Sequence, residues 1–466
     1  MKSLSVLLLL VSAGAAAPAV LGATDLVNAW QAAQQHNPGF AAARAQWEAG
    51  LTRKRQGRAL SLPQVTASAA GGYIETDRNT TGAQFNAPGF GASNDATFRT
   101  HIDGGSTTTW AISAQQSLYS AERLANSRQL DRQSQLAEEQ FRSAQQDLIL
   151  QTAQAYFAVL LAEESLATLQ AQKDAAARAL DVAMERFDAG AAPVTDRDEA
   201  QARFDAIVTD ELLARDELQL KRAAFADLTG LASERLKRVS ADTSFDQFNS
   251  SPLSAWTERA SRRNPLIAMQ DLGRDIARDE LDKFRALMAP SLDLVARVAD
   301  DRMNGGNGFG GTTHLNANTR TVGVQVTIPL YSGGMRDAKR DEAAALVRKS
   351  EFDAQALRQE VLRQTQASWL GVSTGISRVK AQTQALRSAR SRLNATETGR
   401  EVGERTTLDL MNAQTDFYQA QRNLAQVKYQ LLLDRLRLAA VAGDLTDAEL
   451  REVNAVLAHV DAPASK

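Results

Sequence analysis

The side chains that carry most protein chemistry are rare or widely spaced in this sequence. There is no cysteine, which excludes disulfides, thiolate metal sites and thiol catalysis. The four histidines have no metal-ligand spacing; they are His36, His101, His314 and His459. No glycine-rich loop ends in Lys-Ser/Thr, so no phosphate-binding loop is expected. The sequence therefore predicts no enzyme, no metal and no cofactor, and it places any energy source in another protein.

Two short segments, around Gly190 and Gly403, combine a glycine with nearby charged residues. Each glycine follows a long helical pattern, as helix-ending glycines do. Asp196 and Asp409 come shortly afterwards, where a carboxylate in the first turn of a helix is stabilised by the dipole by about 0.3–1 kcal/mol. These segments are the candidate site, and two long helical hairpins must position them.

Bulk composition favours long helices in an exported protein. Only 10 prolines interrupt the 466 residues, and 53 basic and 55 acidic residues give a net charge of −2, which does not suggest nucleic-acid binding. Residues 1–23 resemble a secretory signal, with Lys2, an apolar run and small residues up to a cleavage site near Ala23 or Ala17. That apolar run is shorter than the roughly 20 residues of a spanning helix.

The chain is internally duplicated. Asn37-Pro38 recurs as Asn264-Pro265, and Pro63 as Pro290, at one offset (264 − 37 = 290 − 63 = 227). Further pairs lie 213 apart; they are Tyr156 with Trp369, Gly190 with Gly403, Asp196 with Asp409, and Gly230 with Gly443. A longer loop in the first copy accounts for nearly all of the change in offset from 227 to 213.

Each copy is predicted to run helix, strand, loop, strand, very long helix, turn, helix. The first repeat, 24–251, contains a helix from Asp25 to Arg58, strand 62–74, loop 76–107, strand 108–119, helical hairpin 121–230 and linker 231–251. The second, 252–458, contains a helix from Ser254 to Leu287, strand 290–299, loop 301–319, strand 320–331, hairpin 334–442 and a C-terminal equatorial segment, before a tail at 459–466.

The four strands alternate apolar and polar residues, which is the pattern of a transmembrane β-barrel. The apolar sets are Val65, Ala67 and Ala69; Trp110, Ile112 and Ala114; Leu292, Leu294, Ala296 and Val298; and Val322, Val324, Val326, Ile328 and Leu330. Trp110, Tyr119 and Tyr331 stand where membrane-interface aromatics are expected. A small soluble hairpin with one buried face is the alternative.

Four strands cannot close a barrel, because the smallest single-chain barrels have about eight. The chain is therefore expected to oligomerise, and strand number alone leaves dimer, trimer and tetramer open. The predicted loops are rich in Gly, Asn and Thr, as extracellular barrel loops are. The helical hairpins carry apolar residues in coiled-coil spacing, which also suits an ordinary antiparallel hairpin.

The sequence resembles the TolC family of outer-membrane factors over about residues 24–458. The resemblance is carried by the segment from Asp25 to Pro38, by Leu62-Pro63-Gln64, by the Leu-Tyr-Ser at 118–120 and 330–332, and by both turns, Arg186–Gly190 with Thr195-Asp196 and Val402–Thr406 with Leu408-Asp409.

The resemblance implies a mixed, mostly α membrane protein: a homotrimer whose 12-stranded β-barrel continues into a periplasmic α-helical barrel. It implies a passive, gated channel in the cell outer membrane, working in efflux or type I secretion. The expected partners are outer-membrane lipid, a periplasmic adaptor (membrane fusion) protein and an inner-membrane ABC or proton-driven transporter. A soluble periplasmic coiled-coil adaptor or scaffold is the alternative function.

By resemblance, the helical turns form a periplasmic gate. Asp409 corresponds to a ring of carboxylates, Asn412 replaces a second family aspartate, and Arg400 replaces a family tyrosine. Arg405 matches an arginine that bonds the neighbouring Thr195-Asp196 region, so Arg400 and Arg405 are expected to engage Asp196. The adaptor-contacting turns are expected at Gly190, Ala191, Gly403 and Glu404.

Overall fold

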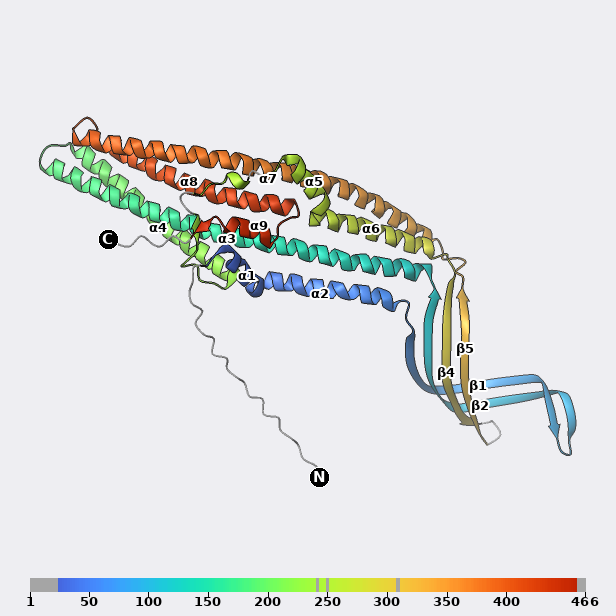
Figure 1. Cartoon of the computed structure of the whole chain (residues 1–466). Helices are drawn as coiled ribbons and strands as arrows, with labels where there is room; N and C mark the ends of the chain where they lie inside the picture. The colour runs from blue at the N-terminus through green and yellow to red at the C-terminus, as the bar shows by residue number, and fades with distance from the viewer. Residues whose placement is uncertain (1–23, 240–242, 249–250, 307–310, 459–466) are drawn as a thin grey trace, which may run out of the picture. The chain divides into compact units, whose positions relative to one another are not determined.

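The computed structural model describes residues 24–239, 243–248, 251–306 and 311–458, so the predicted signal segment and C-terminal tail lie outside the described residues. The elements of the first repeat are α1 (Leu26–His36), α2 (Pro38–Ala59), β1 (Gln64–Ala87), β2 (Gly91–Tyr119), α3 (Ala121–Asp188), α4 (Val194–Thr229), β3 (Arg238–Val239) and η1 (Asp246–Phe248). Those of the second are α5 (Leu253–Arg263), α6 (Pro265–Ala286), β4 (Ser291–Gly306), β5 (Thr312–Thr327), α7 (Met335–Glu401), α8 (Thr407–Val441), α9 (Asp447–Asn454) and β6 (Leu457–Ala458). The chain is mostly helical, and the two halves share the order of their main elements (Figure 1).

The opening helix of each repeat is broken, where one continuous helix was predicted. Asn37 separates α1 from α2, and Asn264 separates α5 from α6; both asparagines are extended, with ψ of 117° and 123°. The cause is the proline that follows each of them, because its ring disfavours helical geometry in the preceding residue.

The contacts divide the chain into two compact units. One contains residues 44–141 and 265–358, including the four-stranded sheet; the other contains 24–43, 142–264 and 359–458, including both hairpin turns.

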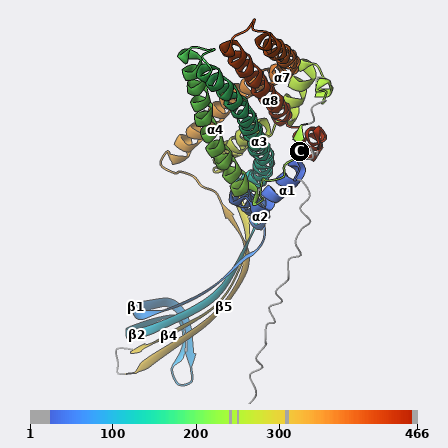
Figure 2. The same cartoon turned by 90° about the vertical axis from the view of Figure 1, so that its left-hand side faces the viewer.

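The sheet is antiparallel throughout and has the order β1-β2-β4-β5, so β1 and β5 are its edges. Figure 2 shows the four strands curving together. A two-stranded sheet, β3 with β6, lies in the other unit.

The strands are longer than predicted. Residues 76–107, predicted as a loop, mostly belong to β1 and β2, which pair out to Ala87 and Gly91 around a turn with Gly89 at φ +88°. The predicted loop at 301–319 likewise belongs largely to β4 and β5. The alternation of apolar and polar residues shows only which side chains face an apolar environment. Backbone pairing between strands can continue through polar residues, so the strands extend beyond the alternating segments.

Strand β5 ends at Thr327, so Tyr331 lies beyond it rather than closing it. Pro329 accounts for the difference, since proline has no N–H to donate to a strand ladder.

The long helices match the predicted spans closely. Helix α3 has 68 residues and α7 has 67, which at 1.5 Å per residue is about 100 Å each. No helix within the described residues combines the length and apolar character needed to cross a membrane.

In the unit that contains the turns, Tyr156 and Trp369 occupy equivalent positions in the two repeats and make equivalent hydrogen bonds. The Tyr156 hydroxyl lies 2.8 Å from the carbonyl oxygen of Lys237, and Trp369 Nε1 donates to the carbonyl of Ser251 at 3.2 Å. Each ring therefore fastens a long helix to the segment that links the repeats.

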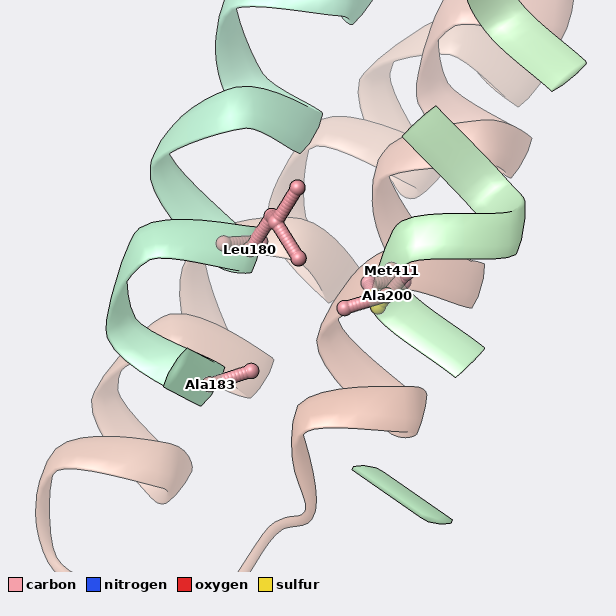
Figure 3. Close-up of a cluster of buried hydrophobic side chains, with 5 residues drawn as sticks. Leu180, Ala183, Ala200 and Met411 are labelled. Atoms are coloured by element: carbon pink, nitrogen blue, oxygen red, sulfur yellow. The ribbon is translucent and has the colours of Figure 1, made fainter. Parts of the chain in front are cut away.

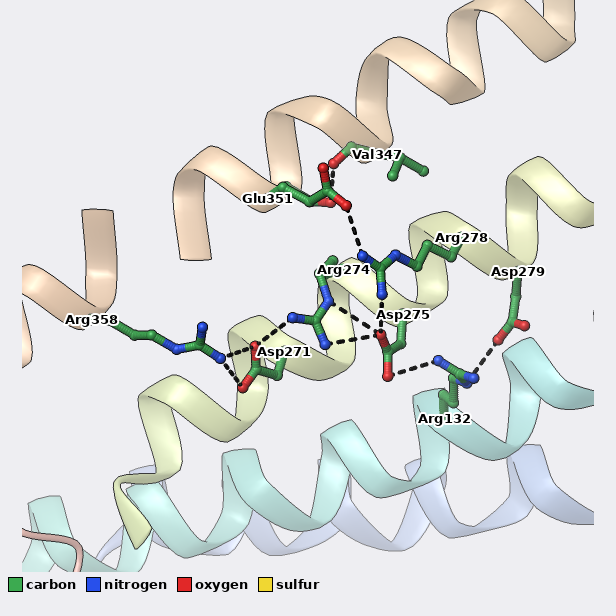
Figure 4. Close-up of polar contacts among 10 residues, drawn as sticks. Arg132, Asp271, Arg274, Asp275, Arg278, Asp279, Val347, Glu351 and Arg358 are labelled. Carbon is green, nitrogen blue, oxygen red and sulfur yellow. Dashed lines mark hydrogen bonds and ion pairs between the residues drawn. The ribbon is translucent and has the colours of Figure 1, made fainter. Parts of the chain in front are cut away.

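In the unit that contains the sheet, charged side chains join the helices. Asp279 of α6 is 3% exposed and faces Arg132 of α3 at 2.9 Å, and Arg132 also contacts Asp275 at 2.8 Å (Figure 4). On the other side of α6, Arg358 and Glu351 of α7 pair with Asp271 and Arg278, each at 2.7 Å. This network positions α6 between its two long neighbours.

Candidate functional site

The two hairpin turns have the same backbone geometry. The amide of Ala191 donates to the carbonyl of Arg186, and that of Glu404 to the carbonyl of Gly399, both at 2.8 Å. Gly190 and Gly403 have φ of +68° and +84°, the left-handed conformation that glycine adopts without strain. No heavy atom lies within 4 Å of a Cβ built on either glycine, so both positions are open in the single chain.

Asp409 and Asp196 are equivalent in the repeat but differ in their partners. Asp409 Oδ2 accepts from the Thr406 amide at 3.1 Å and its hydroxyl at 3.0 Å, while Thr406 Oγ1 accepts from the Asp409 amide, so the pair is a capping box. At the equivalent of Thr406 stands Pro193, which caps α4 without a side-chain bond. Within the described residues the Asp196 carboxylate has no hydrogen bond or ion pair, so it remains available to another chain.

Hydrogen bonds from Thr406, chiefly from its backbone amide, lower the pKa of the Asp409 carboxyl, and Arg405 and Arg392 add a smaller electrostatic effect. The carboxylate is therefore the stable form at neutral pH. Because the folded pKa is lowered, its stabilisation of the cap is complete above the ordinary pKa and is lost as the pH falls through the folded value.

The predicted pairing of Arg400 and Arg405 with Asp196 is absent from the part of one chain that the structure describes. The Arg405 stem lies against Gly399, where an added Cβ would meet Arg405 Cγ at 2.8 Å. Arg400 Nη1 is buried without a hydrogen-bond partner. The pairing of Arg400 and Arg405 with Asp196 therefore stays a prediction.

Below the turns, the two hairpins pack against each other. Ala179, Leu180 and Ala183 of α3, Ala200 of α4 and Met411 of α8 form one buried cluster, and Phe204 packs on it (Figure 3). Small alanines let the helices approach closely. Helix α8 also packs on α7 through Leu393, Leu410, Ala413 and Phe417.

Two contacts at this site escaped the sequence analysis. The Thr406-x-x-Asp409 spacing was a usable signal for the capping box. The second contact, from Arg203 Nη2 to Asn412 Oδ1 at 2.6 Å, joins residues 209 apart and leaves no local pattern.

The sheet is the other candidate surface, and its apolar residues lie in register. Trp110 is opposite Ala69 and Asp300, and Ile112 is opposite Ala67 and Val298, so these side chains share a face. The same face carries Val322 opposite Ala296, Val324 opposite Leu294, and Val326 opposite Leu292. In the single chain it is open: Val322 is 79% exposed.

An irregularity places Tyr119 on this face as well. The register shifts between Ser117 and Tyr119, so Tyr119 is opposite Leu292 while Ser117 is opposite Asp293. Without that shift, the odd-numbered Tyr119 and the even-numbered Trp110 would face opposite sides.

Removal of the Thr406 hydroxyl tests whether the cap orders the turn. We expect Thr406→Ala to cost about 1 kcal/mol locally, because one orphan amide loses its acceptor. Hydrogen exchange at the amides of 406–410 should quicken about fivefold, while Thr195→Ala, which removes no capping bond, should leave its own turn unchanged. Equal exchange rates in wild type and Thr406→Ala would show that the cap does not stabilise the turn.

The sequence profile of the outer membrane efflux protein family matches residues 29–231 and 256–444, one range in each repeat. The outer membrane protein TolC of Vibrio cholerae is 28% identical over 443 residues, covering 93% of this chain and 94% of that protein. The alkaline protease secretion protein AprF of Pseudomonas aeruginosa is 29% identical over 451 residues, covering 95% and 89%.

Solved structures share the fold. The Campylobacter jejuni CmeC outer membrane channel superposes with a TM-score of 0.73 at 16% identity, covering 94% of this chain and 90% of that one. The Vibrio cholerae outer membrane protein VceC gives 0.70 at 16%, covering 90% and 97%. These matches decide between the two functions that the sequence left open, in favour of the channel. The chain belongs to the outer membrane efflux protein family of TolC-like outer-membrane channels, as its paired turns and duplicated strands predicted.

Proposed function

We propose that three copies of this chain form a passive, gated channel across the outer membrane, with a 12-stranded barrel above a periplasmic helical tube. The observation that carries the proposal is the sheet: four strands with one apolar face in register and two edges, β1 and β5, that have no strand partner among the described residues. In lipid every backbone group needs a partner, so such a sheet must close on other copies.

The apolar face is nearly as tall as the apolar band of a transmembrane barrel. From Asp300, at the level of Trp110, to Leu292, at the level of Tyr119, strand β4 advances eight residues, or about 26 Å. A strand tilt of about 40° reduces this to about 20 Å, on the scale of the roughly 25 Å apolar band of such barrels. Trp110 and Tyr119 then mark the two membrane interfaces, and Tyr331 follows the end of β5 on the same side as Tyr119.

The domain boundaries follow the same division. We propose that each repeat, 24–251 and 252–458, contributes one β-hairpin to the barrel and one helical hairpin to the tube, after removal of residues 1–23. The paired extensions of β1 with β2 and of β4 with β5 past Trp110 and Asp300 then stand outside the membrane.

The helical turns are proposed as the gate. Asp409 lines the narrow end, and Asn412 gives that end less negative charge than a second aspartate would. Arg400 and Arg405 reach Asp196, beside Thr195, in a neighbouring copy; the Asp196 carboxylate, which has no hydrogen bond or ion pair within the described residues, supports this. The turns at Gly190-Ala191 and Gly403-Glu404 receive a periplasmic adaptor, which links the channel to an inner-membrane ABC or proton-driven transporter.

Relatives point to both kinds of cargo. The Brucella suis protein BepC is named an outer membrane efflux protein, whereas AprF and the Dickeya chrysanthemi protein PrtF are named for protease secretion. We propose efflux or type I secretion as the role of this chain.

Crosslinking of the detergent-solubilised protein tests the assembly, and a ladder ending at three chains is expected. Conductance in planar bilayers tests the latch: Arg405→Ser with Asp196→Ala should raise the mean conductance several-fold, because each copy loses a charge-assisted contact to its neighbour. Arg387→Ser, on the exposed face of α7, is the matched control. A double variant as closed as the parent would place the latch elsewhere, and a purely monomeric, non-conducting protein would refute the channel itself.

A further inference from the structure

Arg203 and Asn412 form a polar contact between the two helical hairpins of one chain, near their turns. Arg203 lies on α4 of the first hairpin and Asn412 on α8 of the second. The guanidinium Nη2 donates to the amide Oδ1 at 2.6 Å. Both side chains are partly buried, so water competes less for the bond than it would at an open surface.

The bond sits beside the buried cluster that joins the hairpins. Ala200, one turn before Arg203, is fully buried, and Met411, the neighbour of Asn412, is 3% exposed. The cluster reaches toward the turns as far as Ala183 of α3, which is 1% exposed. Arg203–Asn412 therefore adds a polar bond to the contact between the hairpins near their turns.

Farther from the turns, α8 is fastened to α3 by a series of similar bonds. Tyr418 donates to the carbonyl of Ala171 at 3.1 Å, and Arg422 Nη1 to Gln172 Oε1 at 3.1 Å. Deeper still, the ring of Tyr429 stacks on Phe157 with centroids 5.7 Å apart. The attachment is thus aromatic at the base, and near the turns it combines the small buried cluster with the Arg203–Asn412 bond.

We propose that Arg203 is a gating residue: its bond to Asn412 tethers the second hairpin to the first, and its release lets the turn end of α8 move away while the base around Tyr429 stays packed. This inference rests on the proposed channel function. It deepens it by naming a restraint within each copy, distinct from the Arg405–Asp196 contact between copies.

The acceptor makes the tether releasable. Asn412 offers a neutral oxygen, so the bond is worth about a tenfold change in an equilibrium rather than the larger factor of a bidentate ion pair. A neutral acceptor also separates the tether from charge effects on the bore, because Asn412→Leu breaks the bond and leaves the charge unchanged.

A double-mutant cycle on the full-length trimer in planar bilayers tests the proposal. Arg203→Met and Asn412→Leu should each raise the open fraction by at least about tenfold, since every copy loses the bond, and the double variant should rise no further, because all three variants lack the same bond. Arg197→Met is the matched control: Arg197 lies on the same helix but pairs with Asp198 and lies over the ring of Phe187, within the first hairpin.

The outcomes separate the two proposals. If Arg203→Met opens the channel and Asn412→Leu does not, the effect is one of charge and the tether is refuted. If both variants conduct as the parent does, the tether is refuted while the channel stands. If the unaltered trimer does not conduct at all, the channel function itself fails.

A chemical lock gives an independent measurement, since the chain has no native cysteine. Arg203→Cys with Asn412→Cys, joined by a thiol-cleavable bis-methanethiosulfonate linker, should hold conductance at the closed level, and reduction should restore opening. Single-cysteine variants treated in the same way are the control. Free opening of the crosslinked channel would overturn the proposal.

Discussion

Gly443→Ala is expected to destabilise the unit that contains the helical turns by about 3 kcal/mol or more. Gly443 ends α8 with φ +73°, where a Cβ costs about 1–2 kcal/mol. The added methyl would also lie 2.1 Å from the carbonyl oxygen of Arg263 and 2.7 Å from the amide nitrogen of Asn264. Both are backbone atoms, so neither can rotate away, and overpacking of this kind costs about 1–3 kcal/mol.

The surrounding contacts leave little room for adjustment. Asn264 Nδ2 donates to the carbonyl of Val441 at 2.7 Å, and Arg263 pairs with Asp444 at 2.8 Å. These bonds hold the α5–α6 junction against the end of α8. Moving either segment to admit the methyl would break at least one of them.

Glycines with similar backbone angles provide a graded control series. Gly403→Ala, at φ +84° with open space around it, should cost only the backbone term, about 1–2 kcal/mol. Gly230→Ala, the repeat-equivalent of Gly443, should fall between them, because its methyl would meet the ring of His36, a side chain that can move.

Thermal unfolding followed by circular dichroism at 222 nm in detergent checks this order. Gly443→Ala should melt lowest and Gly403→Ala closest to the parent. If Gly443→Ala melted together with Gly403→Ala, the close approach of the α5–α6 junction would be disproved.

Val322→Arg is expected to prevent assembly in the outer membrane. Val322 lies on the apolar face of β5, opposite Ala296 and midway between the levels of Leu292 and Asp300. Arginine at the midplane of a barrel costs about 2–4 kcal/mol, and three copies multiply that to about 6–12 kcal/mol per trimer. We expect monomer that is degraded in the periplasm instead of trimer in the membrane fraction.

Gln325→Arg is the control on the same strand. Gln325 is opposite Asp293, on the polar face, where an arginine would stand in the bore beside a carboxylate. This variant should assemble as the parent does and shift the ion selectivity of the channel toward anions. Trimer abundance by crosslinking and reversal potentials in a salt gradient check the two variants. Normal assembly of Val322→Arg would contradict the assignment of the lipid-facing side.

The sequence by itself determined the plan of the chain. The offsets between Asn37 and Asn264 and between Gly190 and Gly403 revealed the duplication, and the helical hairpin predicted at 121–230 matches α3 and α4. Apolar alternation identified which side chains of each strand share a face. These properties are local, because helix formation and strand amphipathicity are decided by neighbours a few residues away.

Only the tertiary structure decided where strands stop, which face Tyr119 occupies and what holds the hairpins together. Polar residues 76–102 continue as paired strands because backbone hydrogen bonds do not depend on side-chain polarity. The register shift beside Ser117 and the Arg203–Asn412 bond depend on how distant segments pack. Two residues 209 apart have no common period in the sequence, so only the packing of α4 against α8 can bring them within a hydrogen bond.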